Sequence, residues 1–183
     1  MALFIYVDNS NVLIEGQRVS AVDKRMAPDI FTAMTDGIVD HDWTFDYGRL
    51  YDLVGPVGDK VGRAVLFGSR PPPNDEIWQR AELEGWEPII HDRNVANKEK
   101  KVDVQLATEM MRDLYKRMKR GADSVVLVAG DGDFIPAVEA VIEEGLSVHC
   151  LFWDQVNGEL KRTVDRFTSL NPHLNHLRRS RTY

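Results

Sequence analysis

The stretch VVLVAGDGDFIPAV, Val125 to Val138, decides the fold of this chain. Five apolar or small residues run into Gly130-Asp131-Gly132-Asp133, and apolar residues then recur at helical spacing. This order predicts a buried strand, a tight turn and a helix. One carboxylate at such a turn is enough to cap the helix, so the second carboxylate needs a further explanation.

The rest of the chain repeats this alternation of short apolar runs and amphipathic segments. Strands are predicted at Leu3–Val7, Ala64–Phe67, Glu87–Ile90, Ser124–Ala129 and Ser147–Trp153. Helices are predicted at about Phe45–Leu53, Asp75–Glu84, Val102–Arg120, Phe134–Glu144 and Gly158–Phe167. Near-continuous apolar strands between helices predict an α/β fold, namely a three-layer sandwich with a central, mostly parallel five-stranded sheet.

The domain organisation predicted from length and composition is simple. A chain of 183 residues that is 43% apolar suits one domain with a sizeable core, spanning residues 1–183. Within it, residues 168–183 are expected to form a C-terminal tail, and the stretch HLRRSRTY (176–183) is expected to be a solvated end. The region Gly16–Thr44 has no clear periodicity and is expected to form a helix plus loops over one end.

Charge and cysteine content limit the kinds of partner. The 23 basic and 29 acidic residues give a net charge of -6, which argues against binding nucleic acid through bulk positive charge. The single cysteine, Cys150, lies in an apolar run, which predicts a core position and fits a reducing compartment. Met1–Val7 is too short and uncharged for a signal peptide, and no run approaches the roughly 20 apolar residues of a membrane span. We therefore expect a cytoplasmic protein without a membrane partner. Nothing in the sequence indicates a homo-oligomer.

Several carboxylates are expected to meet at one edge of the sheet. Asp8 follows the first predicted strand, with Asn11 three residues later, and Asp131 and Asp133 follow the fourth. The carboxyl ends of parallel strands gather at a single edge, where sites form in such folds. Asp103 lies in the first turn of a helix that starts at the same edge. It belongs to the inward-facing stripe of Ala107, Met110, Leu114 and Met118.

Four ionised carboxylates cannot crowd together without a cation between them. Hard cations prefer oxygen ligands, and Mg²⁺ or Mn²⁺ held by carboxylates and water is the arrangement used on phosphate esters. The pattern therefore predicts a site for Mg²⁺ or Mn²⁺ formed by Asp8, Asp103, Asp131 and Asp133. Gly130 and Gly132 are expected to let the backbone turn tightly enough to aim Asp131 and Asp133 inward.

Three motifs carry a resemblance to a known family: IYVDNSN (5–11), KKVDVQLATEMM (100–111) and VVLVAGDGDFIPAVEAVIEEG (125–145). They resemble the NYN branch of the PIN-like nuclease superfamily, in particular the LabA-like bacterial proteins. The resemblance implies a PIN-like fold and a metal-dependent ribonuclease site with RNA as substrate. It further implies that the four aspartates form the acidic set and that Asn11 orients water or a ligand. Lys101 stands where the family pattern usually has glycine.

Basic residues near the same edge are candidates for holding RNA phosphates, although a solvated loop explains them nearly as well. They are Arg70, Arg93, Lys98, Lys100 and Lys101. The acidic residues also have ordinary explanations. Asp133 fits an N-cap, Asp131 a turn residue and Asp8 an Asx-turn.

Other functions fit the sequence less well. Neither a G-x-x-x-x-G-K-[ST] nor a G-x-G-x-x-G motif is present, which disfavours nucleotide-triphosphate and dinucleotide binding. A TOPRIM-type metal site would be expected to have a glutamate where Asp8 stands. The alternative that stays open is a catalytically inactive PIN-like regulatory module that binds RNA or protein.

Overall fold

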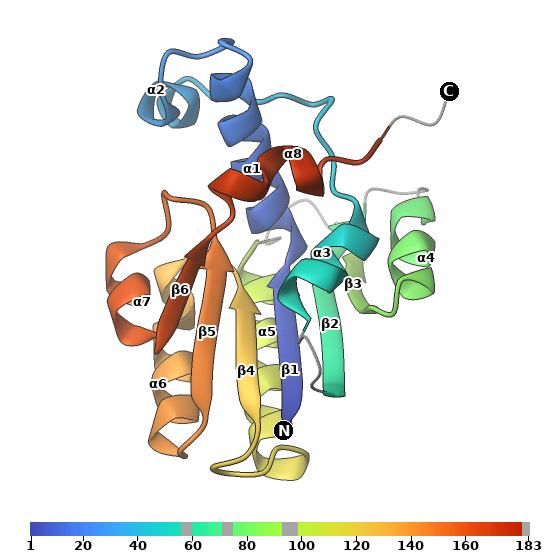
Figure 1. Ribbon diagram of the computed structural model, residues 1–183, viewed down its shortest axis with the longest axis vertical. Coiled ribbons are helices and arrows are strands. Elements are labelled where there is room, and N and C mark those ends of the chain that lie inside the picture. The colour runs from blue at the N-terminus through green and yellow to red at the C-terminus, as the bar shows by residue number, and fades with distance from the viewer. Residues whose placement is uncertain (56–59, 71–74, 93–98, 181–183) are drawn as a thin grey trace.

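The computed structural model describes residues 1–55, 60–70, 75–92 and 99–180 (Figure 1). Its elements are, in chain order, β1 (Ala2–Asp8), α1 (Asn9–Asp23), α2 (Ile30–Thr35), α3 (Tyr47–Val54), β2 (Lys60–Arg70), α4 (Glu76–Leu83), β3 (Glu87–Asp92), α5 (Glu99–Lys116), β4 (Ser124–Val128), the 3₁₀ helix η1 (Gly132–Phe134), α6 (Ile135–Glu143), β5 (Ser147–Phe152), α7 (Gly158–Thr163), β6 (Arg166–Ser169), the 3₁₀ helix η2 (Asn171–His173) and α8 (Leu174–Leu177). No helix in these described ranges is both long and apolar enough to cross a membrane.

The sheet has the order β3-β2-β1-β4-β5-β6, and every pair of neighbouring strands is parallel. Helices flank it, with α5 and α6 behind the sheet and α3 in front in the view of Figure 1. The predicted parallel α/β fold is thus confirmed. The chain leaves β1 toward β2 on one side and later returns to pair β4 on the other. The ends of β1 and β4 therefore flank a topological switch point, where such folds leave a crevice.

The predicted strand number of five is wrong, because β6 adds a sixth strand at the edge. The helix predicted to reach Phe167 ends at Thr163, since Val164 takes an extended conformation with φ -72° and ψ 151°. Strand β6 has four residues, none of them fully buried, so it carries no strong hydrophobic pattern. The predicted C-terminal tail from residue 168 also contributes side chains to the core. Leu170, Leu174 and Leu177 are buried beyond β6.

Helix α1 starts directly after β1, earlier than the region from Gly16 in which a helix was expected. Its buried side includes Glu15 and Ser20 besides Val12 and Ala21, so the apolar periodicity is weak. Gly16 is buried in the middle of the helix. A larger residue does not fit there, because a Cβ would lie 2.6 Å from the rings of both Trp43 and Trp153. Close packing, rather than helix propensity, therefore sets the sequence of α1.

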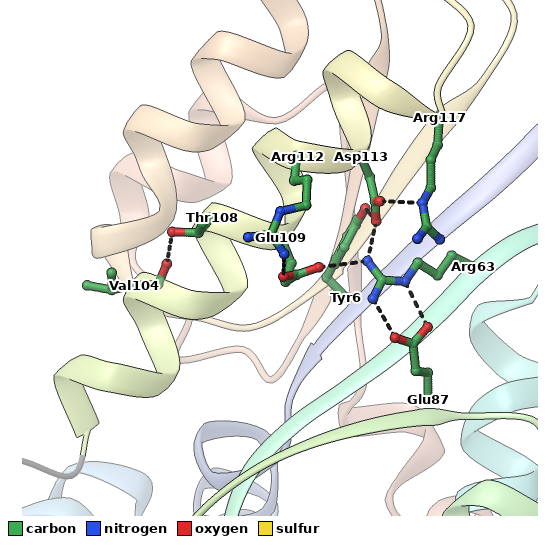
Figure 2. A network of polar contacts seen from close by, with 9 residues as sticks. All are labelled: Tyr6, Arg63, Glu87, Val104, Thr108, Glu109, Arg112, Asp113 and Arg117. Carbon is green, nitrogen blue, oxygen red and sulfur yellow. Dashed lines mark hydrogen bonds and ion pairs between the residues drawn. The ribbon is translucent and has the colours of Figure 1, made fainter.

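A buried ionic network fixes α5 against the sheet (Figure 2). Arg63 of β2 donates from Nη1 to Asp113 Oδ2 at 2.7 Å and to Glu109 Oε2 at 3.0 Å. Its Nε donates to Glu87 Oε2 of β3 at 2.8 Å, and Tyr6 of β1 donates to Asp113 Oδ2 at 2.8 Å. Arg63 thus joins β2 to α5 and β3, and Asp113 links α5 to β1 as well.

We predict that Arg63→Met lowers the free energy of unfolding by about 3 kcal/mol, because it removes the cation shared by the buried Asp113 and Glu109 carboxylates and leaves them to the more exposed Arg117 and Arg112. Urea unfolding followed by circular dichroism measures the loss. Arg80→Gln is the matched control, since it breaks only the exposed pair with Glu76 on α4 and should cost less than about 0.5 kcal/mol. A loss for Arg63→Met as small as the control's would contradict a structural role for the network.

Candidate active site

A pocket of about 420 Å³ opens where β1 and β4 end, at the switch point of the sheet. It is formed by the end of β1, one side of α1, the first turns of α5, Ser69 of β2 and the turn after β4. The lining residues are Asp8, Ser10, Asn11, Ile14, Glu15, Arg18, Ser69, Val102, Asp103 and Asp131. Segments remote in sequence therefore meet at the edge predicted to carry a site.

Asp8 has two roles in this arrangement. It is the last residue of β1 and the N-cap of α1, where its Oδ1 accepts from the backbone N–H of Asn11 at 3.1 Å. Only 5% of it is exposed, and burial is the main reason that its pKa is raised to about 7. The neighbouring Asp103 raises this pKa further through its charge and a side-chain hydrogen bond, whereas the backbone N–H groups of Asn11 and Ser10 oppose the shift.

Asn11 connects α1 to the turn after β4. Its Oδ1 accepts from the backbone N–H of Gly130 at 2.9 Å, across 119 residues of sequence. With the carbonyl oxygen engaged in this way, the amide nitrogen is the part of the side chain suited to donate to a ligand. Asn11 therefore holds the two strand ends together in addition to lining the pocket.

The two aspartates after β4 differ in position. Asp131 lines the pocket, and its Oδ1 accepts from the backbone N–H of Asp133 at 3.1 Å, which caps η1. Both aspartates are exposed, but Asp133 does not line the pocket. The structure thus brings together three of the four predicted carboxylates, Asp8, Asp103 and Asp131, and leaves Asp133 outside.

The predicted phosphate-binding residues fall mostly beyond the described part of the chain. Arg93 and Lys98 lie outside the described residues. Arg70 ends β2, and Lys100 and Lys101 belong to the first turn of α5, so their backbones lie at the pocket edge. The side chains of these three are also outside the description.

Sequence reasoning missed the contribution of α1. Asn11, Ile14, Glu15 and Arg18 line the pocket at spacings of three, four and seven residues, which is one face of a helix. The signal was present in the sequence. It was overlooked because the helix was not expected to begin immediately after Asp8.

The glycines beside Asp131 serve a purpose other than the predicted one. Neither Gly130 nor Gly132 has a positive φ, so the turn does not depend on their conformational freedom. A Cβ at Gly130 would lie 2.0 Å from the ring of Phe152, and one at Gly132 would lie 2.8 Å from the amide nitrogen of Asn157. These two glycines are needed because β5 and the start of α7 pack closely against the turn.

The donor set fits a hard divalent cation held by few protein ligands. Asp8 and Asp103 place two carboxylates in contact, and the pKa of Asp8 is raised first by burial and then by the charge and hydrogen bond of Asp103. Within the described residues, no group of three or more His, Cys, Asp or Glu side chains is arranged to hold a metal ion. Mg²⁺ is commonly bound by one or two carboxylates with water completing the shell, which is the kind of site that this pocket accommodates.

The fold and the pocket define a class of protein: an open, doubly wound parallel α/β domain with carboxylates at its topological switch point. The profile of the NYN domain matches residues 5–171, so the chain belongs to the NYN domain family. This family is part of the PIN-like nuclease superfamily, a group of hydrolases, in line with the resemblance noted in the sequence.

Comparison with solved structures supports the fold. A crystallised protein of unknown function from Vibrio parahaemolyticus is similar to this chain with a TM-score of 0.64 and 18% sequence identity. The similarity covers 92% of each chain. No curated protein sequence matches the chain.

We predict that Gly130→Ala destabilises the protein by about 1–3 kcal/mol, because the added methyl group must displace the buried ring of Phe152. Gly158→Ala is the matched control, since its Cβ would meet only Arg162 Nη1 at 3.5 Å. Thermal melts should show a lowered midpoint for the first variant and no loss for the second. Equal midpoints would mean that the turn relaxes without cost.

A second prediction concerns Asp8 in metal-free protein. Its folded-state pKa of about 7 lies above the ordinary value of 3.8, so the folded chain keeps a proton that the unfolded chain releases between about pH 4 and pH 7. Stability must fall as pH rises through this window. Asp8→Asn removes the effect and keeps the cap. It should be more stable than wild type by about 2–4 kcal/mol at pH 8, with the gain vanishing near pH 4.

Chemical unfolding at both pH values in chelator measures this difference. Asp52→Asn, at an exposed position of α3, is the control and should leave the pH dependence unchanged. A gain for Asp8→Asn that is the same at pH 4 and pH 8 would show that the charge of Asp8 is not its cause.

Proposed function

We propose that the chain is a metal-dependent ribonuclease of the LabA-like branch of the NYN domain family. One observation carries the proposal: Asp8, Asp103 and Asp131 come from three separate segments and line one pocket at the switch point. Their grouping matches the residues that the family resemblance implies. Membership of the PIN-like superfamily supports hydrolysis of a phosphodiester.

The proposed roles follow from the contacts of each residue. Asp8 and Asp103 hold Mg²⁺ or Mn²⁺, and Asp131 lines the same pocket from the turn after the neighbouring strand β4. When bound, the cation supplies Lewis acidity that activates a water and offsets negative charge on the phosphodiester. Asn11, held through Gly130, donates from its amide to the water or to the substrate. The reaction then needs no nucleophilic side chain.

The choice of RNA as substrate rests on the resemblance to LabA-like proteins. Weak, salt-sensitive binding is expected for a chain of net charge -6, because only local contacts hold the polyanion. Arg70, Arg93, Lys98, Lys100 and Lys101 remain candidates for such contacts by their position in the sequence.

A second function, that of a regulatory module that binds RNA or protein without cutting, is favoured by one observation. Within the described ranges, no three side chains form a metal-binding set. Such a module would use the pocket for recognition alone. It would bind RNA equally well with or without a divalent cation.

We predict that wild-type protein cleaves labelled single-stranded RNA in Mg²⁺ or Mn²⁺ but not in chelator, and that Asp8→Asn and Asp131→Asn abolish cleavage. The reason is that each substitution removes a carboxylate from the pocket that attracts the cation. Gel electrophoresis of the products measures the rate, and a DNA strand of the same sequence tests the choice of sugar.

Two further variants sharpen this assay. Asp52→Asn lies on α3 away from the pocket lining and should cleave like wild type. Asp133→Asn tests whether the pocket or the sequence motif identifies the catalytic residues, because Asp133 belongs to the motif but does not line the pocket. We expect a small effect on the cleavage rate. Cleavage that persists unchanged in Asp131→Asn would point to a contaminating nuclease. RNA binding without any wild-type cleavage would favour the regulatory module.

A further inference from the structure

Arg18 is the one basic residue among the described residues that line the pocket. It lies on α1, seven residues after Asn11 and on the same face, so its side chain extends the pocket wall away from the sheet edge. Its side chain is 22% exposed, well below that of an ordinary surface arginine. The predicted phosphate-binding set does not include it.

The guanidinium of Arg18 is held in place by a second layer of contacts. Its Nη1 forms an ion pair with Glu15 Oε1 on the preceding turn of α1. The other oxygen of Glu15 accepts from Gln155 Nε2 at 2.8 Å, across 140 residues of sequence. Glu15 is therefore fixed from two sides, and it fixes Arg18 in turn.

The Nε–H donor of Arg18 is not engaged by the described part of the protein. Arg18 Nε is shielded from solvent and has no hydrogen-bond partner among the described residues. A buried donor without a partner costs free energy and calls for an explanation such as a bound ion or water. An oxyanion beside the guanidinium satisfies Nε–H together with a neighbouring N–H group, the paired geometry in which arginine binds phosphate.

The charges of the described lining residues limit where a phosphate can bind in the pocket. The lining contains the carboxylates of Asp8, Glu15, Asp103 and Asp131 against the single cation of Arg18. Among the described lining residues, Arg18 is the one side chain whose charge attracts a phosphodiester, apart from a cation bound at the carboxylates. The two attractive points are separated along α1, because seven helical residues span about 10 Å.

We propose that Arg18 forms a phosphate-binding subsite that takes the phosphodiester next to the one at the carboxylates. The subsite rests on the proposed function, in which RNA enters the pocket. Glu15 and Gln155 hold the guanidinium ready before the ligand arrives, which limits the entropy lost on binding. Arg18 thus positions the strand and takes no part in bond cleavage.

The experiment compares wild type, Arg18→Gln and Arg18→Lys in binding a fluorescent 12-nucleotide single-stranded RNA in Ca²⁺, by anisotropy across a range of salt. Arg18→Gln should bind about tenfold more weakly. Its log–log salt slope should be shallower by about 0.7, the value for one phosphate contact on a single strand. Arg18→Lys keeps the charge without the planar fork, so it should recover the slope and only part of the affinity.

Arg112→Gln is the matched control. Arg112 also pairs with a glutamate three residues before it on a helix, Glu109 of α5, but it does not line the pocket. It should bind like wild type. Equal affinity and slope in Arg18→Gln and wild type would overturn the subsite, as would an equal loss in Arg112→Gln. Thermal melts of the three arginine variants identify any loss caused by unfolding, and in that case Arg18→Lys, which keeps the pair with Glu15, decides the outcome.

Cleavage in Mn²⁺, scored on the same proteins, separates this inference from the proposed function. A subsite that only positions the strand should raise KM and leave kcat nearly unchanged in Arg18→Gln. Arg18-dependent binding without cleavage by any protein would overturn the nuclease and leave the subsite intact. Cleavage by wild type together with RNA binding that does not depend on Arg18 would overturn the subsite and support the nuclease.

Discussion

The position of α5 is the constraint on which the site depends, and the shared cation of Arg63 sets it. Asp113 contacts Arg63 of β2 and Tyr6 of β1, so the helix cannot slide along the sheet without breaking buried charge pairs. Asp103 lies ten residues earlier on the same helix, about 15 Å toward the carboxyl edge of the sheet. A network at one place in the core therefore delivers a carboxylate to the pocket at another.

The aspartates of the pocket can cap helices and line the site at the same time. Asp8 caps α1 and Asp131 caps η1, as ordinary N-terminal residues do, and both line the pocket. A helix that starts directly after a parallel strand begins at the carboxyl edge of the sheet, so its capping residue is at that edge as well. Each cap uses a carboxylate oxygen for the backbone, and the carboxylate of Asp8 also forms a hydrogen bond with Asp103.

Local patterns in the sequence were sufficient for the central strands and for the edge at which the site lies. Strands β1 and β4 are buried on both faces, so their apolar runs are continuous. The pattern failed at α1, whose buried side includes Glu15 and Ser20, and at β6, which has no fully buried residue. Arg18 was missed for the same reason, because its place in the pocket follows from the phase of α1. Asp131 and Asp133 share one motif, but Asp133 does not line the pocket, and the motif alone does not tell this difference.

The acidic character of the chain gives the arginine subsite its importance. A basic protein holds RNA over a wide surface, and the loss of one arginine then changes its affinity little. A chain of net charge -6 has no such surface field, so each attractive contact carries a larger share of the binding free energy. Arg18 lies beyond Asp8 and Asn11 along α1, and under the proposed function a strand anchored at the metal would place its next phosphate there. Substrates too short to have that phosphate should therefore be cut at a rate that does not depend on Arg18, whereas longer strands should depend on it through KM.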